Sequence, residues 1–308
     1  MVLIFSERRR VNFFPERTYI KLIDTSNFDL KAYLKKQAEV VNRALEAYFP
    51  ADASYIGNLG EVMRYSLFPG GKRFRPILTL AVAEALGLDP QLALPAACSF
   101  ELVHCFSLVH DDLPCMDNDD MRRGKPTVHK AYGEDTALLA GDALVIEAFN
   151  VAAQTAIPNH PELTIAIIKE LAEASGHLGM VGGQILDMEA QHHGADQEKL
   201  LAVHKGKTGA LIRGAARVGA IAAQATPDML EAITEYSEIL GLVFQITDDI
   251  LDSADDPDPI SFPTLFGMEE SKHIAKEKTA RALELIEPLG EKAIPLAALA
   301  NYLLVRTV

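Results

Sequence analysis

The 308-residue chain has no tryptophan and only three cysteines, Cys98, Cys105 and Cys115. No two of them show Cys-x-x-Cys spacing, which argues against a zinc site, a redox motif or the disulfide framework of a small secreted protein. Alternating β-branched and aromatic stretches joined by Asn-Gly or Asp-Gly turns are also absent, which argues against a β-rich fold. Alanine and leucine, which both favour helix, dominate instead.

Positive charge and targeting signals are scarce as well. The chain has 29 Lys and Arg against 43 Asp and Glu, so its formal net charge is −14 and nucleic acid is not an expected partner. The apolar start Met1–Phe5 is too short for a signal peptide, and its arginines follow rather than precede it. We identify no apolar run of about 18 residues. We therefore predict a cytoplasmic protein without a membrane span.

The domain organisation is simple. Residues 1–26 differ from the rest, so we predict an N-terminal extension there and one domain over residues 27–308. Because apolar residues recur at helical spacing, this domain should be an all-α, single-domain bundle of about ten or more helices around a central apolar cavity. The expected helices cover residues 28–48, 77–86, 94–112, 136–156, 161–190, 200–223, 227–252, 269–287 and 293–306.

An acidic cluster stands at the end of a helix that we expect to be buried. Asp111 and Asp112 end an almost uncharged run, and Asp117, Asp119 and Asp120 follow closely. Neighbouring carboxylates raise one another's pKa, which is unfavourable unless a cation neutralises them. Mg²⁺ typically combines one or two carboxylates with substrate phosphate oxygens. We therefore predict a Mg²⁺ site, the alternative being a solvated acidic loop.

A second acidic cluster repeats this arrangement. Asp248, Asp249 and Asp252 follow the apolar stretch Ile239–Phe244, and their spacing of three and four residues places them on one helix face. One such cluster is a weak signal. Two clusters, each at the end of a core helix, suggest a cavity with metal sites on opposite walls.

Basic residues occur in three glycine-containing segments, Gly70–Pro76, Arg122–Lys125 and Lys205–Gly209. Glycine lets the backbone approach a phosphate closely, and helix starts favour anions, so the first and third segments are candidate phosphate sites at helix N-termini. His104 lies two helical turns before Asp111 and on the same face. The alternatives are solvated basic loops and an ordinary buried histidine.

These segments resemble the trans-isoprenyl diphosphate synthase family of farnesyl and geranylgeranyl diphosphate synthases. The resemblance runs from about Asn27 to Arg306 and implies the isoprenoid synthase type I fold, Mg²⁺ dependence and a homodimer. The matching segments are Gly71–Pro76, Ser107–Asp120, Arg122–Thr127, Ala140–Leu144, Gly182–Gln184, Lys207–Leu211 and Phe244–Asp252.

The resemblance also implies a role for each candidate residue. Three Mg²⁺ ions, with Mn²⁺ as an alternative, would be held at Asp111, Asp112, Asp117, Asp248, Asp249 and Asp252. The allylic diphosphate and the carbocation would be handled by the catalytic residues Arg122, Lys207, Thr208 and Gln245. Isopentenyl diphosphate would be bound by Gly71, Lys72, Arg75, His104 and Arg123.

The implied reaction explains these residue types. Breaking an allylic C–O bond requires stabilisation of a leaving diphosphate, which metal ions, Arg and Lys supply. The allylic cation must then meet isopentenyl diphosphate without meeting water, which an apolar cavity ensures. Phe106 and Ser107 lie five and four residues before Asp111, where bulky side chains limit product length in this family. We therefore favour farnesyl diphosphate over geranylgeranyl diphosphate as the product.

The sequence departs from the family after Asp252. A loop carrying Gly-Lys and a later Lys is expected there, yet the chain runs almost directly into Ile260–Gly267. Either the chain lacks this loop, or the printed sequence leaves it out. We favour the second interpretation because the flanking residues still match. A terpene cyclase and a non-catalytic regulatory subunit are weaker alternatives, because both aspartate motifs are retained.

Overall fold

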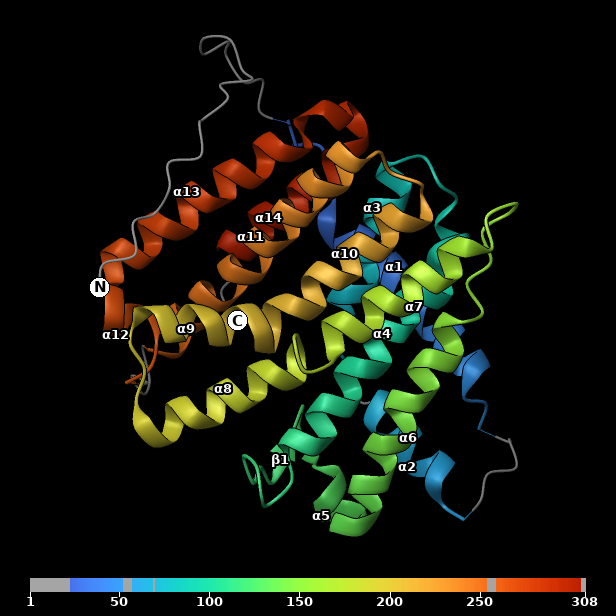
Figure 1. The fold of residues 1–308 in the computed structure, drawn as a ribbon, viewed down its shortest axis with the longest axis vertical. Coiled ribbons are helices and arrows are strands. Elements are labelled where there is room, and N and C mark those ends of the chain that lie inside the picture. Colours follow the sequence, from blue (N-terminus) through green and yellow to red (C-terminus); the bar gives the residue numbers. More distant parts are fainter. Residues whose placement is uncertain (1–22, 52–56, 69, 254–258, 306–308) are drawn as a thin grey trace, which may run out of the picture.

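A computed structural model describes residues 23–51, 57–68, 70–253 and 259–305, which are mostly helical (Figure 1). This confirms the all-α fold. The predicted extension over residues 1–26 lies almost entirely outside these ranges. The longer helices are α1 (Leu30–Tyr48), α3 (Phe74–Ala85), α4 (Pro90–Asp111), α6 (Glu134–Ala152), α7 (Glu162–Ser175), α8 (Met180–His193), α10 (Ala210–Ala222), α11 (Pro227–Asp252), α13 (Met268–Ile286) and α14 (Ile294–Val305).

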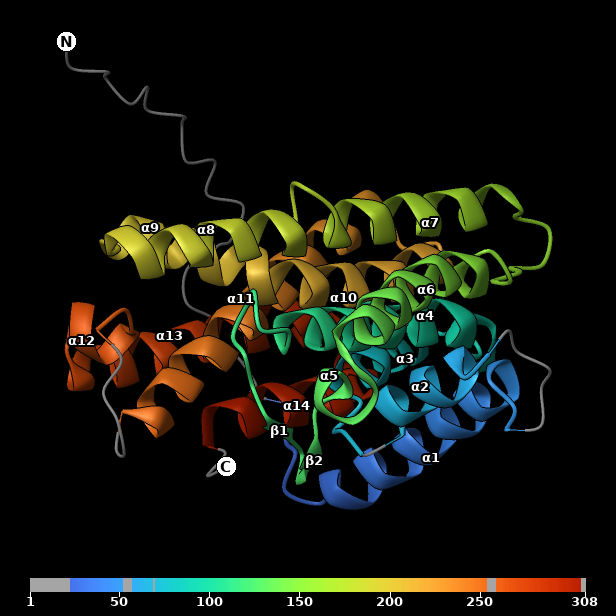
Figure 2. The same ribbon diagram turned by 90° about the horizontal axis from the view of Figure 1, so that it is seen from below.

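Short elements connect these helices. They are α2 (Leu59–Leu67), α5 (Val128–Tyr132), α9 (Gln197–Val203), α12 (Phe262–Phe266), the π-helical segment η1 (His204–Gly209) and the 3₁₀ segment η2 (Glu287–Ala293). Strands β1 (Met121–Arg122) and β2 (Lys125–Pro126) form a small antiparallel hairpin. Figure 2 shows α7, α8 and α9 on one side of the molecule and α1, α2 and α14 on the other, with α4, α10 and α11 between them.

Helix α4 is a central helix of the bundle and ends at the first aspartate motif. Asp89 caps it by accepting a hydrogen bond from the Gln91 amide, and Pro90 occupies the first helical position, where its missing N–H costs nothing. The helix contacts α3, α6 and α10. By length and hydropathy α4 could also cross a membrane, contrary to the sequence expectation, but 67% of the apolar window is buried inside the bundle. A buried core helix can have the same length and hydropathy as a membrane-spanning helix.

Two long helices expected from the sequence are interrupted in the structure. The expected helix over residues 161–190 breaks between α7 and α8, because Gly176 turns to an extended conformation (ψ −156°). The expected helix over residues 200–223 contains the wider turn of η1 between α9 and α10. The expectation that Lys205–Gly209 begins a helix is therefore wrong. This segment lies in the middle of a continuous helical run.

The three cysteines are free and occupy different environments. Cys98 and Cys105 are buried on α4, and burial raises the pKa of the Cys105 thiol to about 12. Cys115 is exposed in the turn that follows α4. No disulfide is formed, in agreement with the expectation from their spacing.

Candidate active site

The first aspartate motif begins where α4 ends. The Asp117 amide donates to the Asp111 carbonyl at 2.8 Å, which folds the chain back after the helix. Burial raises the pKa of the Asp111 carboxyl to about 6, and the nearby Asp117 and Asp112 carboxylates add to this, while Lys207 and Arg122 oppose it. Asp111 therefore lies in a partly desolvated position that favours a cation.

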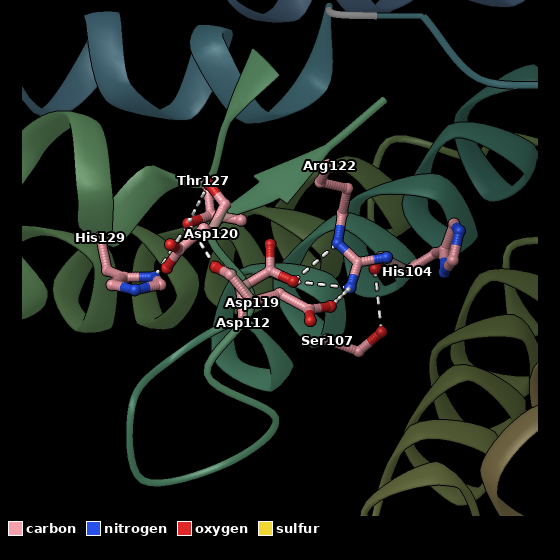
Figure 3. Close-up of polar contacts among 8 residues, drawn as sticks. All are labelled: His104, Ser107, Asp112, Asp119, Asp120, Arg122, Thr127 and His129. Carbon is pink, nitrogen blue, oxygen red and sulfur yellow. Dashed lines mark hydrogen bonds and ion pairs between the residues drawn. The ribbon is translucent and has the colours of Figure 1, made fainter. Parts of the chain in front are cut away.

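Asp112 has a different environment, although it is adjacent in sequence. Its carboxylate is 3% exposed and accepts a hydrogen bond from Arg122 Nε at 2.6 Å (Figure 3). Arg122 Nη2 also donates to Asp119 at 3.0 Å. The structure therefore holds Asp112 and Arg122 against each other. Arg122 was expected to contact a diphosphate, and Asp112 to support a metal.

The β1–β2 hairpin is fixed on both sides. Thr127 Oγ1 donates to the Asp119 carbonyl at 2.8 Å, and Lys130 pairs with Asp120 at 2.8 Å. At the hairpin turn, Arg123 adopts a left-handed conformation (φ 53°), and its guanidinium donates to the Gly70 carbonyl at 2.6 Å. This contact joins the segment after the first motif to the basic loop before α3.

The basic loop, Arg123 and His104 form a cationic cluster. Arg75 is partly buried, and its buried Nε atom has no hydrogen-bond partner within the described residues. Burial lowers the pKa of His104 well below its usual value, and the neighbouring Arg75 and Arg123 guanidinium groups lower it further. Lys72 is exposed at the edge of this cluster. A buried donor of this kind among several cations suits an anionic ligand.

Lys207 lies on the other side of Asp111, in η1. Its ammonium group donates to Asp187 on α8 at 2.6 Å. Burial alone would lower its pKa, but Asp187, followed by Asp111 and Asp117, raises the Lys207 pKa overall. The pair depends on close backbone contact, because a Cβ added to Gly183 would lie 2.0 Å from the Lys207 amide nitrogen. Only glycine allows α8 and η1 to approach this closely.

The second aspartate motif ends α11. Asp249 accepts a hydrogen bond from the Phe262 amide at 2.8 Å, and His204 Nε2 lies 3.8 Å from the same carboxylate. The His204 ring stacks on the Phe262 ring. Asp248 is partly buried and Asp252 is exposed. The expected loop omission concerns residues 255–262, of which residues 255–258 lie outside the described ranges, so it stays a prediction.

The predicted metal ligands fit a site that substrate completes. Within the described residues, no group of three or more His, Cys, Asp or Glu side chains is arranged to hold a metal by itself. Mg²⁺ usually takes one or two carboxylates and fills its shell with water and phosphate oxygens. Asp111 and Asp117 offer such oxygen ligands on one wall, and Asp248 offers another. The metal assignments of all six aspartates remain predictions.

The remaining candidates lie in η1, on α11 and on α4. Thr208 in η1 and Gln245 on α11 are partly buried. The Phe106 ring meets the His110 ring edge-on at 5.3 Å, and His110 Nε2 lies 3.0 Å from the Leu138 carbonyl of α6. Ser107 Oγ donates to the His104 carbonyl of its own helix at 2.9 Å. Phe106 therefore stands where α4 packs against α6.

Sequence reasoning missed two residues of α8. Asp187 is the partner of Lys207, and the Gln184 amide is buried without a hydrogen-bond partner in the part of the chain that the structure describes. Both lie on one helix face, three residues apart. The Gly182–Gln184 motif marked this region, but the pairing with Lys207 required knowledge of how α8 packs on η1.

A groove of about 880 Å³ is lined by residues of α8, α9 and η1. Helices α10, α11 and α13 complete its walls, and no aspartate of either motif lines it. Four exposed apolar side chains border it, namely Leu178, Val181, Ile185 and Leu201. The groove is therefore separate from the site that the motifs form.

Comparison with known proteins supports the resemblance noted in the sequence. Residues 57–284 match the family described as Polyprenyl synthetase. The chain is 42% identical to geranylgeranyl pyrophosphate synthase 3, chloroplastic, from Arabidopsis thaliana, over 91% of this chain and 82% of that protein. The large subunit 1 of a heterodimeric geranylgeranyl pyrophosphate synthase from the same plant is 39% identical, over 92% and 81% of the two chains.

A crystal structure with the same fold comes from Zymomonas mobilis. That protein is described as an FPP/GFPP synthase. The two structures superimpose with a TM-score of 0.84 at 36% sequence identity, over 90% of this chain and 99% of that chain. A putative farnesyl-diphosphate synthase from Marinomonas sp. MED121 gives a TM-score of 0.80 at 36% identity. With the fold and both aspartate motifs in place, the chain belongs to the polyprenyl synthetase family of trans-isoprenyl diphosphate synthases.

Proposed function

We propose that this chain is a short-chain prenyltransferase that condenses isopentenyl diphosphate with dimethylallyl or geranyl diphosphate. The observation that carries the proposal is the division of charge around the end of α4. A cationic cluster that contains the buried Arg75 Nε atom lies on one side, and carboxylates with Lys207 lie on the other. Two diphosphates with different partners fit this arrangement, one held by cations of the protein and one by metal ions.

The carboxylate side suits the allylic substrate. Enzymes of this family generally use Mg²⁺, and bound ions would neutralise the growing charge of the leaving diphosphate. We propose that Asp111, Asp117 and Asp248 hold the ions. Lys207 lies next to Asp111 and Asp187, so its ammonium group is held close to where that charge develops. The proton released after condensation needs only a weak base, for which the departing diphosphate suffices.

The cationic side suits isopentenyl diphosphate. Arg75, Arg123 and Lys72 supply fixed positive charge, and the Arg75 Nε donor lacks an acceptor that a phosphate oxygen would provide. His104 is held neutral by its surroundings in the free protein and would gain a favourable partner when the anion binds.

We propose farnesyl diphosphate as the main product, because the Phe106 ring packs against the core and edge-on against His110 on α4, where it would limit the growing chain. Geranylgeranyl diphosphate is the alternative, favoured by the names of the plant relatives. Replacing Phe106 by Ala should lengthen the product, as measured by chromatography of the dephosphorylated prenols. An unchanged product distribution would show that Phe106 does not set the length.

The decisive experiment uses purified protein, Mg²⁺, labelled isopentenyl diphosphate and either allylic primer. We expect diphosphate release and labelled prenyl product only when both substrates are present, with loss of both in EDTA. If the protein alone forms no product but stimulates a partner synthase, the regulatory-subunit alternative is correct.

We also propose a homodimer located in the cytoplasm. Eight of the ten large apolar side chains that are exposed in the described residues lie between the start of α6 and the end of α9. Such a concentration of exposed apolar surface marks an interaction site. Light scattering after size-exclusion chromatography should give twice the mass of one chain. Substitution of Ile146, which is 67% exposed, by Glu should shift it towards the monomer.

A further inference from the structure

Arg73 lies in the basic loop but is buried rather than turned to the cationic cluster. It is 2% exposed and precedes α3 directly in the left-handed conformation (φ 48°, ψ 34°). Non-glycine residues adopt this conformation only when the surroundings hold them there. Three acceptors from three elements do so here, and the Arg73 guanidinium donates to each of them.

The three acceptors connect the loop to the rest of the bundle. Arg73 Nε donates to Asn42 Oδ1 of α1 at 2.9 Å, and Nη2 donates to the Leu67 carbonyl at the end of α2 at 2.6 Å. Nη1 donates to Glu101 Oε1 of α4 at 2.6 Å. The planar guanidinium suits this arrangement, because its donors point in fixed directions that lysine cannot reproduce.

Glu101 brings this anchor close to the candidate isopentenyl diphosphate site. It is 2% exposed and precedes His104 by three residues, so both lie on one face of α4. Its negative charge also acts on Arg75. Burial lowers the pKa of Arg75, and the charge of Glu101 partly offsets this decrease. Arg73 thus connects the loop that carries Lys72 and Arg75 to the helix that carries His104.

We propose that Arg73 and Glu101 are positioning residues for isopentenyl diphosphate. They contact no substrate themselves. Their buried ion pair fixes the spacing between the basic loop and α4, so that Lys72, Arg75 and His104 converge on one diphosphate. This inference rests on the proposed function, because it assumes that isopentenyl diphosphate binds there.

The test separates positioning from simple stability. The single variants Arg73→Met and Glu101→Leu each leave a buried charge without its partner and should lower the Tm strongly. The double variant Arg73→Met/Glu101→Leu removes both charges and should recover most of the Tm. Its affinity for isopentenyl diphosphate, measured by titration calorimetry, should nevertheless be about ten- to a hundredfold lower than that of the wild type. Lys72, Arg75 and His104 would no longer be correctly placed to contact the diphosphate. The KM for the allylic primer should stay within about twofold.

Two further variants keep the inference testable if the double variant does not fold. Asn42→Ala removes one acceptor from a partly buried position and should weaken isopentenyl diphosphate binding by about threefold. Glu170→Gln disturbs a comparable pair, in which Arg217 Nε donates to Glu170 at 2.9 Å between α7 and α10. It should lower the Tm without changing isopentenyl diphosphate binding.

The outcomes distinguish the two proposals. If a folded double variant or Asn42→Ala binds isopentenyl diphosphate as tightly as the wild type, the positioning role is wrong. If Glu170→Gln weakens binding equally, the effect reflects general stability, and the positioning role is again wrong. If the wild type binds no isopentenyl diphosphate, the proposed function fails instead.

Discussion

The two aspartate motifs end two core helices, yet the protein holds them in different ways. In the first motif, the guanidinium of Arg122 binds Asp112 and cancels its charge. In the second, the backbone amide of Phe262 donates a hydrogen bond to Asp249. In both Asp-Asp pairs, the protein anchors the second aspartate.

This difference has an electrostatic consequence. The first motif carries its own counter-charge, so its geometry is set before any ligand arrives. In the second motif, His204 Nε2 lies 3.8 Å from the Asp249 carboxylate, and the Phe262 amide donates to the same carboxylate.

The largest effect should come from the first aspartate of each pair. Asp111→Asn and Asp248→Asn should each lower kcat by about 10²–10³-fold, because each removes charge that holds a metal near the leaving group. Steady-state assays of diphosphate release measure this. Asp228→Asn, at the exposed opposite end of α11, is the control. Full activity of Asp248→Asn would remove the second motif from the metal site.

The contacts that hold Asp112 and Asp249 should contribute different amounts to the free energy of unfolding. Arg122→Met leaves the buried Asp112 carboxylate unpaired and should lower the free energy of unfolding by about 2–3 kcal/mol. This is below the value for a fully buried pair because the Arg122 side chain is 33% exposed. Urea unfolding measures the change, and Arg43→Met on the exposed face of α1 is the control. A loss no larger than that of the control would mean that Asp112 is solvated.

The hydrogen bond from the Phe262 amide to Asp249 should contribute less to the free energy of unfolding. Asp249→Asn keeps an acceptor for the Phe262 amide but removes its charge, so the free energy of unfolding should fall by only about 0.5–1.5 kcal/mol. The same urea titration measures it. A loss greater than that of Arg122→Met would reverse the proposed order of the two anchors.

A further effect concerns the pH dependence of the free protein. His104 has a depressed pKa in the fold, so below about pH 6.5 only the unfolded chain takes up its proton. Stability should therefore fall as pH falls, by up to about 1.4 kcal/mol per pH unit from this residue. His104→Asn should show a shallower decline between pH 7.5 and 5.5, measured as Tm, whereas His160→Asn on the surface should not. Equal slopes would contradict the assignment.

Sequence patterns predicted the parts of the site that depend on local composition. The ends of α4 and α11 were evident because an apolar run changes abruptly to carboxylates at Asp111 and Asp248. The start of α3 after the basic loop was evident because Pro76 fits the first turn of a helix.

Tertiary contacts decided the rest. The break between α7 and α8 and the π-helical turn of η1 interrupt segments whose apolar spacing continues through them. The Lys207–Asp187 pair and the Arg73–Glu101 pair join residues far apart in the chain, through helix packing that no local pattern specifies. The anchoring of Asp112 by Arg122 was likewise invisible in the motif, which suggested only metal binding.

The exposure of Cys115 gives this protein a natural reporter position. The other two thiols are buried, so a maleimide dye should react with Cys115 alone in the folded chain. That residue sits in the turn between Asp111 and Asp117, where substrate and metal are expected to meet. Fluorescence from a single attached dye could therefore follow the ordering of this turn in real time, without any engineered cysteine.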